Sequence, residues 1–411
     1  MQARLDEHRL YIEGKPRGAR LVLRDAPLAG RLLDRAMLKS AVLAGGDLSG
    51  ASLLRADLSF ADLFGANLAD ADLQSADLTR ADLRGGNFAR ARLAGAVLRQ
   101  ADLRAGQIVR WEEGRQKAVD RPADLSDATL DRATMAGARL DGANMARASL
   151  RGATLSDAQM WAVNLSGADL SGADLRACKL RHAVLDGARV EGADLRGCDL
   201  RGASLRNTDI SGAALDGADL TDAVYPKARA ALPPAIAARF EAHVAWINSA
   251  GRQGARADFS DAELTGLDLS GCDFSGALFV GARLAGTRLT DCRLRMADFS
   301  RAVMAGADLQ RADLCGANLT GAALTRAVLR DALAEPVDIL APDGSRTGRD
   351  WPSRFAGADL SQADLRGARL RRASLAGASL RDANLADAAL IGCDTAGADL
   401  SGAITTGWRR G

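Results

Sequence analysis

A five-residue period runs through most of this chain and constrains its fold more than any other feature. From Ala56 the sequence reads ADLSF ADLFG ANLAD ADLQS ADLTR ADLRG, a series of pentapeptides of the form Ala-Asp/Asn-Leu-x-x. Counted by the large apolar residue at each centre, 64 pentapeptides follow one another in four runs. A repeat this short cannot bury its apolar side chains alone, so neighbouring repeats must stack. The sequence therefore predicts an all-β solenoid rather than a globular domain with a pocket.

Three interruptions separate the four runs. The runs of centres extend from Leu23 to Ile108, from Leu125 to Tyr225, from Phe259 to Leu329 and from Phe355 to Leu400. The interruptions are 109–122, 226–256 and 330–354. Of the prolines, only Pro27 lies inside a repeat. Because proline has no N–H to donate to a neighbouring strand, its exclusion from the repeats indicates strand-like pairing between them.

The beginning of the chain recurs near its middle, which indicates an internal duplication. The opening LDEHRLYIEGKPRGAR matches FEAHVAWINSAGRQGAR from Phe240, so that His8 corresponds to His243 and Tyr11 to Trp246. Each of the two segments has the pattern of a short amphipathic helix, which would cover the open first coil. We therefore predict two domains, 1–225 and 226–411, each with a capping helix followed by coils.

Two of the interruptions have the pattern of β-hairpins. The segment IVRWEEGRQKAV is predicted to turn at Glu113-Gly114, and VDILAPDGSRTG at Asp343-Gly344. Each predicted domain thus contains one hairpin-like excursion, at 109–122 in the first and at 330–354 in the second.

The Ala-Asp/Asn-Leu-x-x array resembles the pentapeptide-repeat protein family over most of the chain. The resemblance implies a right-handed quadrilateral parallel β-helix of about 16 four-sided coils, in which the centre and the residue two before it point inward. Cys178 and Cys198 both occupy the small inward position and are 20 residues apart, as are Cys272 and Cys292. Each pair should stack across one coil, close enough for a disulfide, although a cysteine here is first of all a slightly larger core residue than alanine.

Composition and charge exclude several classes of function. The 54 Lys and Arg residues are nearly balanced by 52 Asp and Glu residues, so no basic stripe is available for direct nucleic-acid binding. The N-terminus lacks a signal-peptide pattern, and no apolar run is long enough to span a bilayer. We expect a soluble, cytoplasmic protein without a membrane partner.

No group of residues has the spacing of a catalytic or metal site. The aspartates recur because the repeat recurs, and a convex rod offers little of the cleft that acid–base catalysis needs. The three histidines and six cysteines form no cluster with metal-ligand spacing, and the glycines follow the repeat rather than a phosphate-binding loop. We therefore expect no enzyme activity, no cofactor and no metal.

Apolar side chains at outward positions are the candidate partner contacts, because buried aromatic anchors dominate protein interfaces. Trp111 and Trp351 lie in the excursions, where each of them could alternatively pack against the rod. The full set is Leu54, Phe60, Phe64, Trp111, Trp161 and Trp351.

Two functions are consistent with the sequence. The first is a non-enzymatic scaffold that presents flat faces and loops to a protein partner of unknown identity. The alternative, implied by the family resemblance, is a DNA-mimicking protein that binds or protects DNA gyrase or another topoisomerase. Two loop-like excursions favour the alternative, whereas the lack of overall acidity argues against it. The one acidic patch that it could use consists of Asp57, Asp62, Asp72, Asp77 and Asp82.

Overall fold

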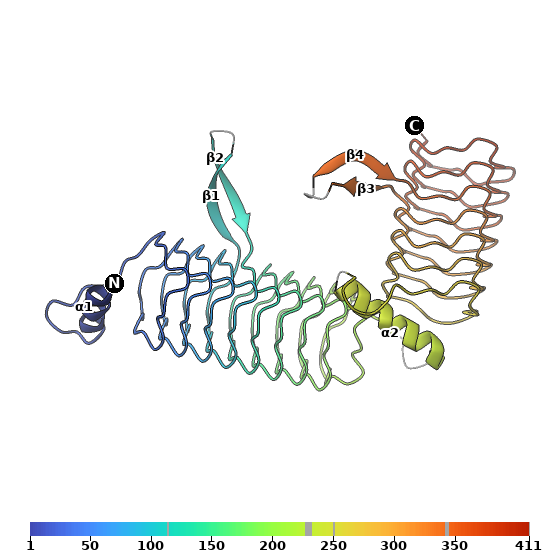
Figure 1. Cartoon of the computed structure of the whole chain (residues 1–411). Helices are drawn as coiled ribbons and strands as arrows, with labels where there is room; N and C mark the ends of the chain where they lie inside the picture. The colour runs from blue at the N-terminus through green and yellow to red at the C-terminus, as the bar shows by residue number, and fades with distance from the viewer. Residues whose placement is uncertain (113–114, 227–231, 250, 342–344, 411) are drawn as a thin grey trace. The chain divides into compact units, whose positions relative to one another are not determined.

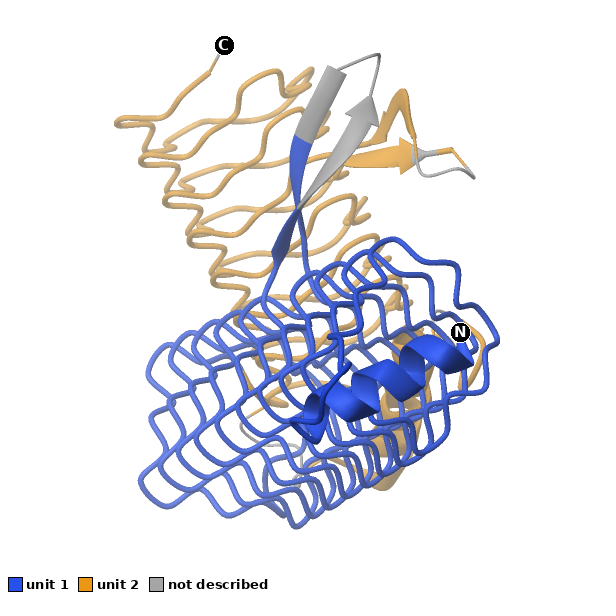
Figure 2. Cartoon of the chain, turned by 90° about the vertical axis from the view of Figure 1, so that its left-hand side faces the viewer, with its two compact units in different colours: residues 1–224 blue, residues 225–411 orange. Residues whose placement is uncertain are grey.

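The computed structural model describes residues 1–112, 115–226, 232–249, 251–341 and 345–410, with side chains for all of these except 108–112, 115–117 and 340. The chain forms two compact units, residues 1–224 and 225–411, coloured separately in Figure 2. Each unit is a stack of coils with one helix before its first coil and one projecting hairpin (Figure 1).

The coils have a constant length of 20 residues. The residue before each centre pairs in parallel with the residue 20 positions later, as Asp57 does with Asp77. The N–H of Leu58 donates to the carbonyl of Asp77 (2.7 Å), and the N–H of Asp77 donates to the carbonyl of Ala56 (2.9 Å). Five-residue sides and a 20-residue coil give four sides, as the family resemblance implied. The chain is therefore a β-helical solenoid.

A tight turn at every corner closes each five-residue side. After the centre Leu58, the N–H of Ala61 donates to the Leu58 carbonyl (3.0 Å), and Phe60 adopts a positive φ of 60°. This third turn position favours glycine, which occupies many of the equivalent corners. The aspartate before the centre also supports the turn, since Asp57 Oδ1 accepts the N–H of Ser59 (2.9 Å). The aspartate and the glycine of the repeat thus both stabilise the corner turn.

The interior of each solenoid is filled by two inward side chains per repeat. Ala56 and Leu58, for example, are at most 1% exposed. The small residue leaves room for the large one in a narrow coil, and each fully buried leucine contributes about 1.5–3 kcal/mol. Like residues stack on like: the rings of Phe279 and Phe299 are parallel, with centroids 4.6 Å apart. The inward side chains of the described coils are therefore packed against one another along the axis.

Pro27 is the one proline inside a repeat, and its place in the first coil explains why it is tolerated. In later coils the N–H at this position donates to the coil before it, as the N–H of Asp47 does to the carbonyl of Ala26 (2.9 Å). The first coil has no coil before it, so Pro27 removes no ladder hydrogen bond. Pro27 still takes part in the ladder, because it bridges to Asp47 through the carbonyl of Ala26 and the N–H of Leu28.

The predicted capping helices are present in both units. Helix α1 (Gln2–Ile12) lies across the beginning of the first stack of coils (Figure 2), and α2 (Pro234–Asn248) precedes the second. His8 Nδ1 accepts the N–H of Leu21 (3.0 Å), and His243 Nδ1 accepts the N–H of Ala257 (3.1 Å). These two bonds tie each helix to the start of its first coil, and they confirm that the two histidines are equivalent.

Both predicted hairpins are present. Strands β1 (Gly106–Glu112) and β2 (Arg115–Arg121) pair antiparallel, and β3 (Val337–Leu340) pairs with β4 (Arg346–Trp351). The turns expected at Glu113-Gly114 and Asp343-Gly344 lie outside the described residues. The hairpins do not interrupt the core, since the coils on either side of each still pair, through Asn87 with Asp124 and through Asn318 with Arg354.

The bounds predicted for the two excursions, 109–122 and 330–354, were wrong at their beginnings. Ile108 has the place of a repeat centre in the sequence but belongs to strand β1. Conversely, Leu333 still belongs to a coil, because it pairs in parallel with Arg369. The last run also extends beyond Leu400, since Arg409 pairs with Ala389.

The two units differ in where the hairpin leaves the coils. In unit 1, Val22 begins a column of bridges whose last member before the hairpin is Asp102, and these residues are 80 positions, or four coils, apart. In unit 2, Asp258 begins the first column, but the last bridge before the hairpin is Leu333, 75 positions later and in a different column. The second hairpin therefore leaves its stack one side earlier relative to its capping helix.

Candidate interaction surface

Phe60 is an exposed aromatic residue on unit 1, as predicted. Its side chain is 46% exposed. Lys39 Nζ lies 5.7 Å from the ring centroid and the guanidinium carbon of Arg80 lies 5.9 Å from it. Both cations are within the distance at which the ring quadrupole attracts positive charge. Phe60 thus forms an apolar spot flanked by two basic side chains.

Phe64 and Leu54 are half-buried and differ in surroundings. A side-chain carbon placed on Gly106, at the base of strand β1, would lie 2.9 Å from the Phe64 ring. The guanidinium carbon of Arg84 lies 5.4 Å from the same ring. Phe64 is therefore in large part a packing residue at the foot of the β1–β2 hairpin. The backbone N–H of Leu54 donates to Asp34 Oδ1 (3.2 Å).

Among the candidate aromatic residues whose side chains the structure describes, Trp161 is the most exposed, at 55%. Its N–H donates to Asp141 Oδ1 one coil earlier (3.0 Å), which fixes its backbone but not its ring. Gln159 precedes it on the same side and pairs with Lys179 in the next coil. Trp161 therefore projects from a flat side, at the position that sequence reasoning assigned to it.

Trp351 lies at the foot of the β3–β4 hairpin and packs partly against the coils. It is 39% exposed, and the guanidinium carbon of Arg354 lies 4.8 Å from its ring centroid. A side-chain carbon on Gly316 would lie 3.4 Å from the Trp351 ring and 3.0 Å from Val337. Trp351 is thus partly packed against the coils, which was the alternative expected for it. Trp111 lies in β1, opposite Gln116, and its side chain is outside the described part.

The five aspartates of the predicted acidic patch are distributed over three sides of unit 1. Asp57 stacks on Asp77 and Asp62 stacks on Asp82, whereas Asp72 belongs to a third column. Because the five carboxylates lie on three sides, a ligand on one side would meet at most two of them. The pair Asp57 and Asp77 forms no ion pair with any described side chain.

Arginines neutralise much of the remaining acidity. Arg84 binds both carboxylate oxygens of Asp82 (2.8 and 2.6 Å), and Arg92 lies 3.3 Å from Asp72. The same Asp-Leu-Arg pairing recurs at Asp102–Arg104, Asp174–Arg176, Asp194–Arg196, Asp199–Arg201 and Asp364–Arg366. The hydrogen bond from its arginine holds the pKa of the Asp194 carboxyl down at about 2. The repeat thus produces a surface of paired rather than isolated charges.

Polar side chains at the small inward position form hydrogen bonds with backbone carbonyls inside the core. The thiols of Cys178 and Cys198 donate to the carbonyls of Leu155 and Leu175, one coil earlier, at 3.0 and 2.9 Å. Thr287 makes the equivalent bond to Leu264 (2.8 Å). All six cysteines are free, so the stacked pairs are core residues and not disulfides.

Cys315 was expected to point outward, and it does follow a repeat centre, but it is only 8% exposed. It precedes Gly316, whose N–H donates to the buried Ser353 hydroxyl (2.9 Å) where the chain returns from the hairpin. Burial raises the pKa of the Cys315 thiol to about 12, so the reactive thiolate is not formed at neutral pH.

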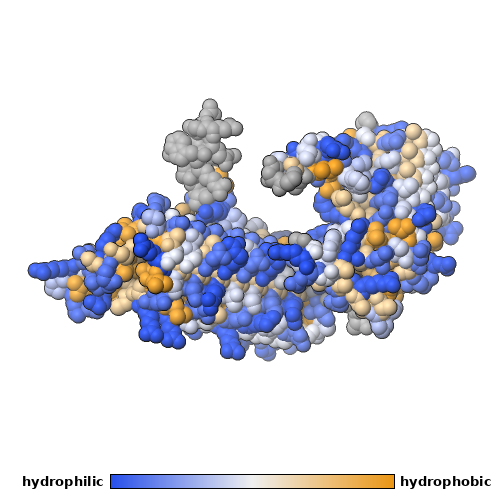
Figure 3. Space-filling model, viewed as in Figure 1, coloured by the Kyte–Doolittle hydropathy of each residue, from blue (hydrophilic) through white to orange (hydrophobic). Residues whose placement is uncertain are grey.

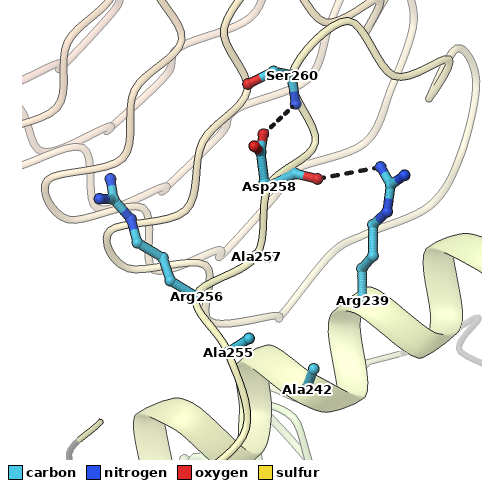
Figure 4. A pocket seen from close by; sticks show the side chains of 7 residues that line it. All are labelled: Arg239, Ala242, Ala255, Arg256, Ala257, Asp258 and Ser260. Atoms are coloured by element: carbon cyan, nitrogen blue, oxygen red, sulfur yellow. Dashed lines mark hydrogen bonds between the residues drawn. The ribbon is translucent and has the colours of Figure 1, made fainter.

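In unit 2, a groove with a volume of about 400 Å³ lies between α2 and the first coil. Arg239 and Arg256 flank Asp258 on opposite sides, as Figure 4 shows. Arg239 Nη1 donates to the Asp258 carbonyl (3.2 Å), and Asp258 Oδ1 accepts the N–H of Ser260 (2.9 Å). The other lining residues are Ala242, Ala255 and Ala257.

Within the described ranges, no three His, Cys, Asp or Glu side chains come together as metal ligands. No described helix is long and apolar enough to cross a membrane. On the face drawn in Figure 3, polar residues cover most of the surface and hydrophobic residues form small separate areas. This surface offers flat sides and loop bases for contact.

The family model described as pentapeptide repeats matches the chain in eight copies. The matched residues are 32–70, 71–105, 123–161, 158–197, 183–222, 257–295, 296–332 and 353–388. Together they cover more than half of the sequence. The chain is a pentapeptide-repeat protein.

Solved structures of other pentapeptide-repeat proteins align with parts of this one. A protein from the Arabidopsis thaliana thylakoid lumen is 32% identical over 20% of this chain and 66% of its own, just under two thirds of its length, with a TM-score of 0.19. HetL, involved in heterocyst differentiation regulation in the cyanobacterium Nostoc, is 21% identical over 81% of this chain and 87% of its own, with a TM-score of 0.15. QnrB1, a plasmid-mediated fluoroquinolone resistance protein, is 18% identical over 51% of this chain and 92% of its own, with a TM-score of 0.27. No curated protein sequence matches significantly.

The groove at the cap of unit 2 is the feature of this pentapeptide-repeat protein that sequence reasoning missed. Arg239 and Arg256 are 17 residues apart, in a helix and a coil. A signal did exist, because both arginines recur in the duplicated segment as Arg4 and Arg20. Nothing in the sequence alone, however, indicated that these side chains reach the first coil.

Proposed function

We propose that this protein is a non-enzymatic scaffold that docks a protein partner on the sides of its coils. The observation that carries the proposal is the exposed Trp161 on a flat side of a solenoid whose described inward side chains are buried. A packed axis leaves no chamber for a reacting substrate, whereas an exposed tryptophan is the residue type most enriched at interface hot spots. Phe60, with its two flanking cations, supports the same role.

The proposal includes the finer features of the fold and the setting. We propose a right-handed quadrilateral coil, about 16 coils in all, and two domains, 1–225 and 226–411. Each domain would present its sides and its hairpin independently. The protein would act in the cytoplasm on a protein partner, without direct contact to nucleic acid or membrane.

Affinity capture with the full chain tests the docking role. The wild-type protein, Trp161→Ala and Arg176→Ala are each immobilised and exposed to native lysate from the source cell, and captured proteins are quantified. Arg176 is an outward residue like Trp161, so its variant is a matched control for surface substitution. We expect one partner to be retained by wild type and Arg176→Ala and lost by Trp161→Ala. Capture that does not change with Trp161→Ala would reject this surface as the docking site.

The second candidate is a topoisomerase-binding DNA mimic, which the two projecting hairpins favour. A phosphate mimic needs uncompensated negative charge along one side. Here Asp82 and Asp72 have arginine partners, which supports the scaffold instead. Purified protein at micromolar concentration should therefore not inhibit DNA supercoiling by gyrase. Dose-dependent inhibition that is lost on neutralising Asp57, Asp62, Asp77 and Asp82 would establish the mimic in place of the scaffold.

A further inference from the structure

The two capping helices are attached to their coils by equivalent arginines. In unit 1, Arg4 Nη2 donates to the carbonyl of Val22 (2.6 Å). In unit 2, Arg239 Nη1 donates to the carbonyl of Asp258 (3.2 Å). Val22 and Asp258 each begin the first column of bridges in their unit. The same clamp between helix and first coil therefore exists twice.

A second arginine completes each clamp. Arg20 Nε donates to the carbonyl of Ser40 (2.5 Å), and Arg256 Nε donates to the carbonyl of Gly276. Each acceptor lies 20 residues beyond its arginine, one coil further along. A guanidinium has five N–H donors, so each group retains donors that these single bonds do not use. Neither Arg239 nor Arg256 makes another hydrogen bond with the described residues.

The units differ at the helix position that faces this clamp. The carbonyl of Glu7 accepts the N–H of Ala19 (3.1 Å), and the carbonyl of Ala242 accepts the N–H of Ala255 (3.0 Å). Glu7 and Ala242 are therefore structural equivalents. The helix of unit 1 carries its own carboxylate at this position, whereas the helix of unit 2 carries only a methyl group, and Ala242 lines the open groove of Figure 4.

We propose that this groove binds the carboxylate of an acidic peptide side chain. Of the lining residues, only Arg239, Arg256 and Asp258 are charged, so the groove has one uncompensated positive charge. The carboxylate of Asp258 offsets one of the two positive charges and also accepts the N–H of Ser260 (2.9 Å), so the other positive charge remains for a ligand. A guanidinium binds a carboxylate with two parallel hydrogen bonds, and Arg239 is exposed with donors to spare.

The size of the groove favours a peptide over a small ion. Its volume of about 400 Å³ lies in the range of ligand pockets, and it leaves room for the aliphatic part of a glutamate and its neighbours. Ala242 and Ala255 provide an apolar surface for the aliphatic part of the glutamate side chain. Because the charges are open to solvent, we expect a single side chain to bind with a dissociation constant of about a millimolar. This site belongs to unit 2, whereas Trp161 belongs to unit 1, and the proposal does not depend on the docking role of Trp161.

Arginine Nε–H resonances of the full chain, measured by NMR, test the proposal directly. The probe is the blocked peptide acetyl-Ala-Glu-Ala-amide, and acetyl-Ala-Gln-Ala-amide is the neutral control of the same shape. We expect saturable shifts of the Arg239 and Arg256 signals with the glutamate peptide and at least tenfold weaker binding of the glutamine peptide. Equal binding of the two peptides would overturn the proposal.

Ala242→Glu is the decisive variant, since it gives unit 2 the residue that unit 1 tolerates at the same place. It should fold normally and lose the response to the glutamate peptide by at least tenfold. Ala376→Glu, on an outer side of unit 2, has the same change in charge and should bind as wild type does. An undiminished response in Ala242→Glu would overturn the proposal. Equal affinity for acetate would overturn the assignment to a peptide side chain.

Discussion

Truncation of a centre residue should damage the solenoid more than almost any outward change. Leu170 is fully buried, and its N–H donates to the carbonyl of Arg189 in the next coil (2.7 Å). The same ladder fixes the spacing to Leu150 and Val190, the centres one coil on either side, so the coils cannot close over a cavity. Leu170→Ala should therefore fall in the upper part of the range for such changes, about 3–5 kcal/mol.

Because a repeat array can unfold in parts, the assay for Leu170→Ala should be local. Hydrogen exchange followed by mass spectrometry should show faster exchange in peptides from 145–195 than in distant coils. Arg176→Ala is the control: Arg176 is exposed and pairs with Asp174, and such surface pairs contribute little. If Arg176→Ala accelerated exchange as much as Leu170→Ala, the assignment of inward and outward faces would be refuted.

Three further predictions follow from the caps, the thiols and the hairpin. Burial lowers the pKa of His243 to about 4 from 6.5, so the unfolded chain binds the proton more tightly. The stability of the α2 cap should fall by about 3 kcal/mol as pH drops from about 6.5 to 4, and His243→Gln should remove this dependence in hydrogen exchange. Iodoacetamide should label half-buried Cys393 before Cys178, which should react only after unfolding, as peptide mapping would show. Gly316→Val should loosen the β3–β4 foot, because Gly316 has a φ of 70° and an added carbon would lie 3.0 Å from Val337; limited proteolysis within 336–351 should then be faster.

The sequence was sufficient to predict the coil, because the same five-residue pattern recurs in every repeat. The coil length was implied by the family resemblance, and the 20-residue spacing of Cys178 and Cys198 agreed with it. The five-residue pattern did not predict the hairpin boundaries correctly. Ile108 is apolar and in frame, yet it belongs to β1; Ala334 is small at a centre position, yet its N–H donates to the carbonyl of Arg369 (2.7 Å). Backbone pairing with the next coil, rather than side-chain size, decides where a coil ends.

The candidate surface was less predictable than the fold. Outward positions were correct for Phe60 and Trp161, because exposure on a flat side depends only on the repeat. Phe64 and Trp351 are partly covered, because each lies beside a hairpin whose path the repeat does not encode. The groove at Arg239 depends on how a helix rests on a coil, which is a tertiary contact that no period reveals.

The different starting sides of the two hairpins have a consequence for how such a protein changes during evolution. Each pentapeptide advances the chain by one side, so loss of a single pentapeptide between cap and hairpin moves the hairpin by a quarter turn around the stack. The coils on either side still meet residue for residue, and the interior columns of alanine and leucine remain in register. Deletions of five residues can therefore move a hairpin to any of the four sides of this solenoid, at little cost to the fold.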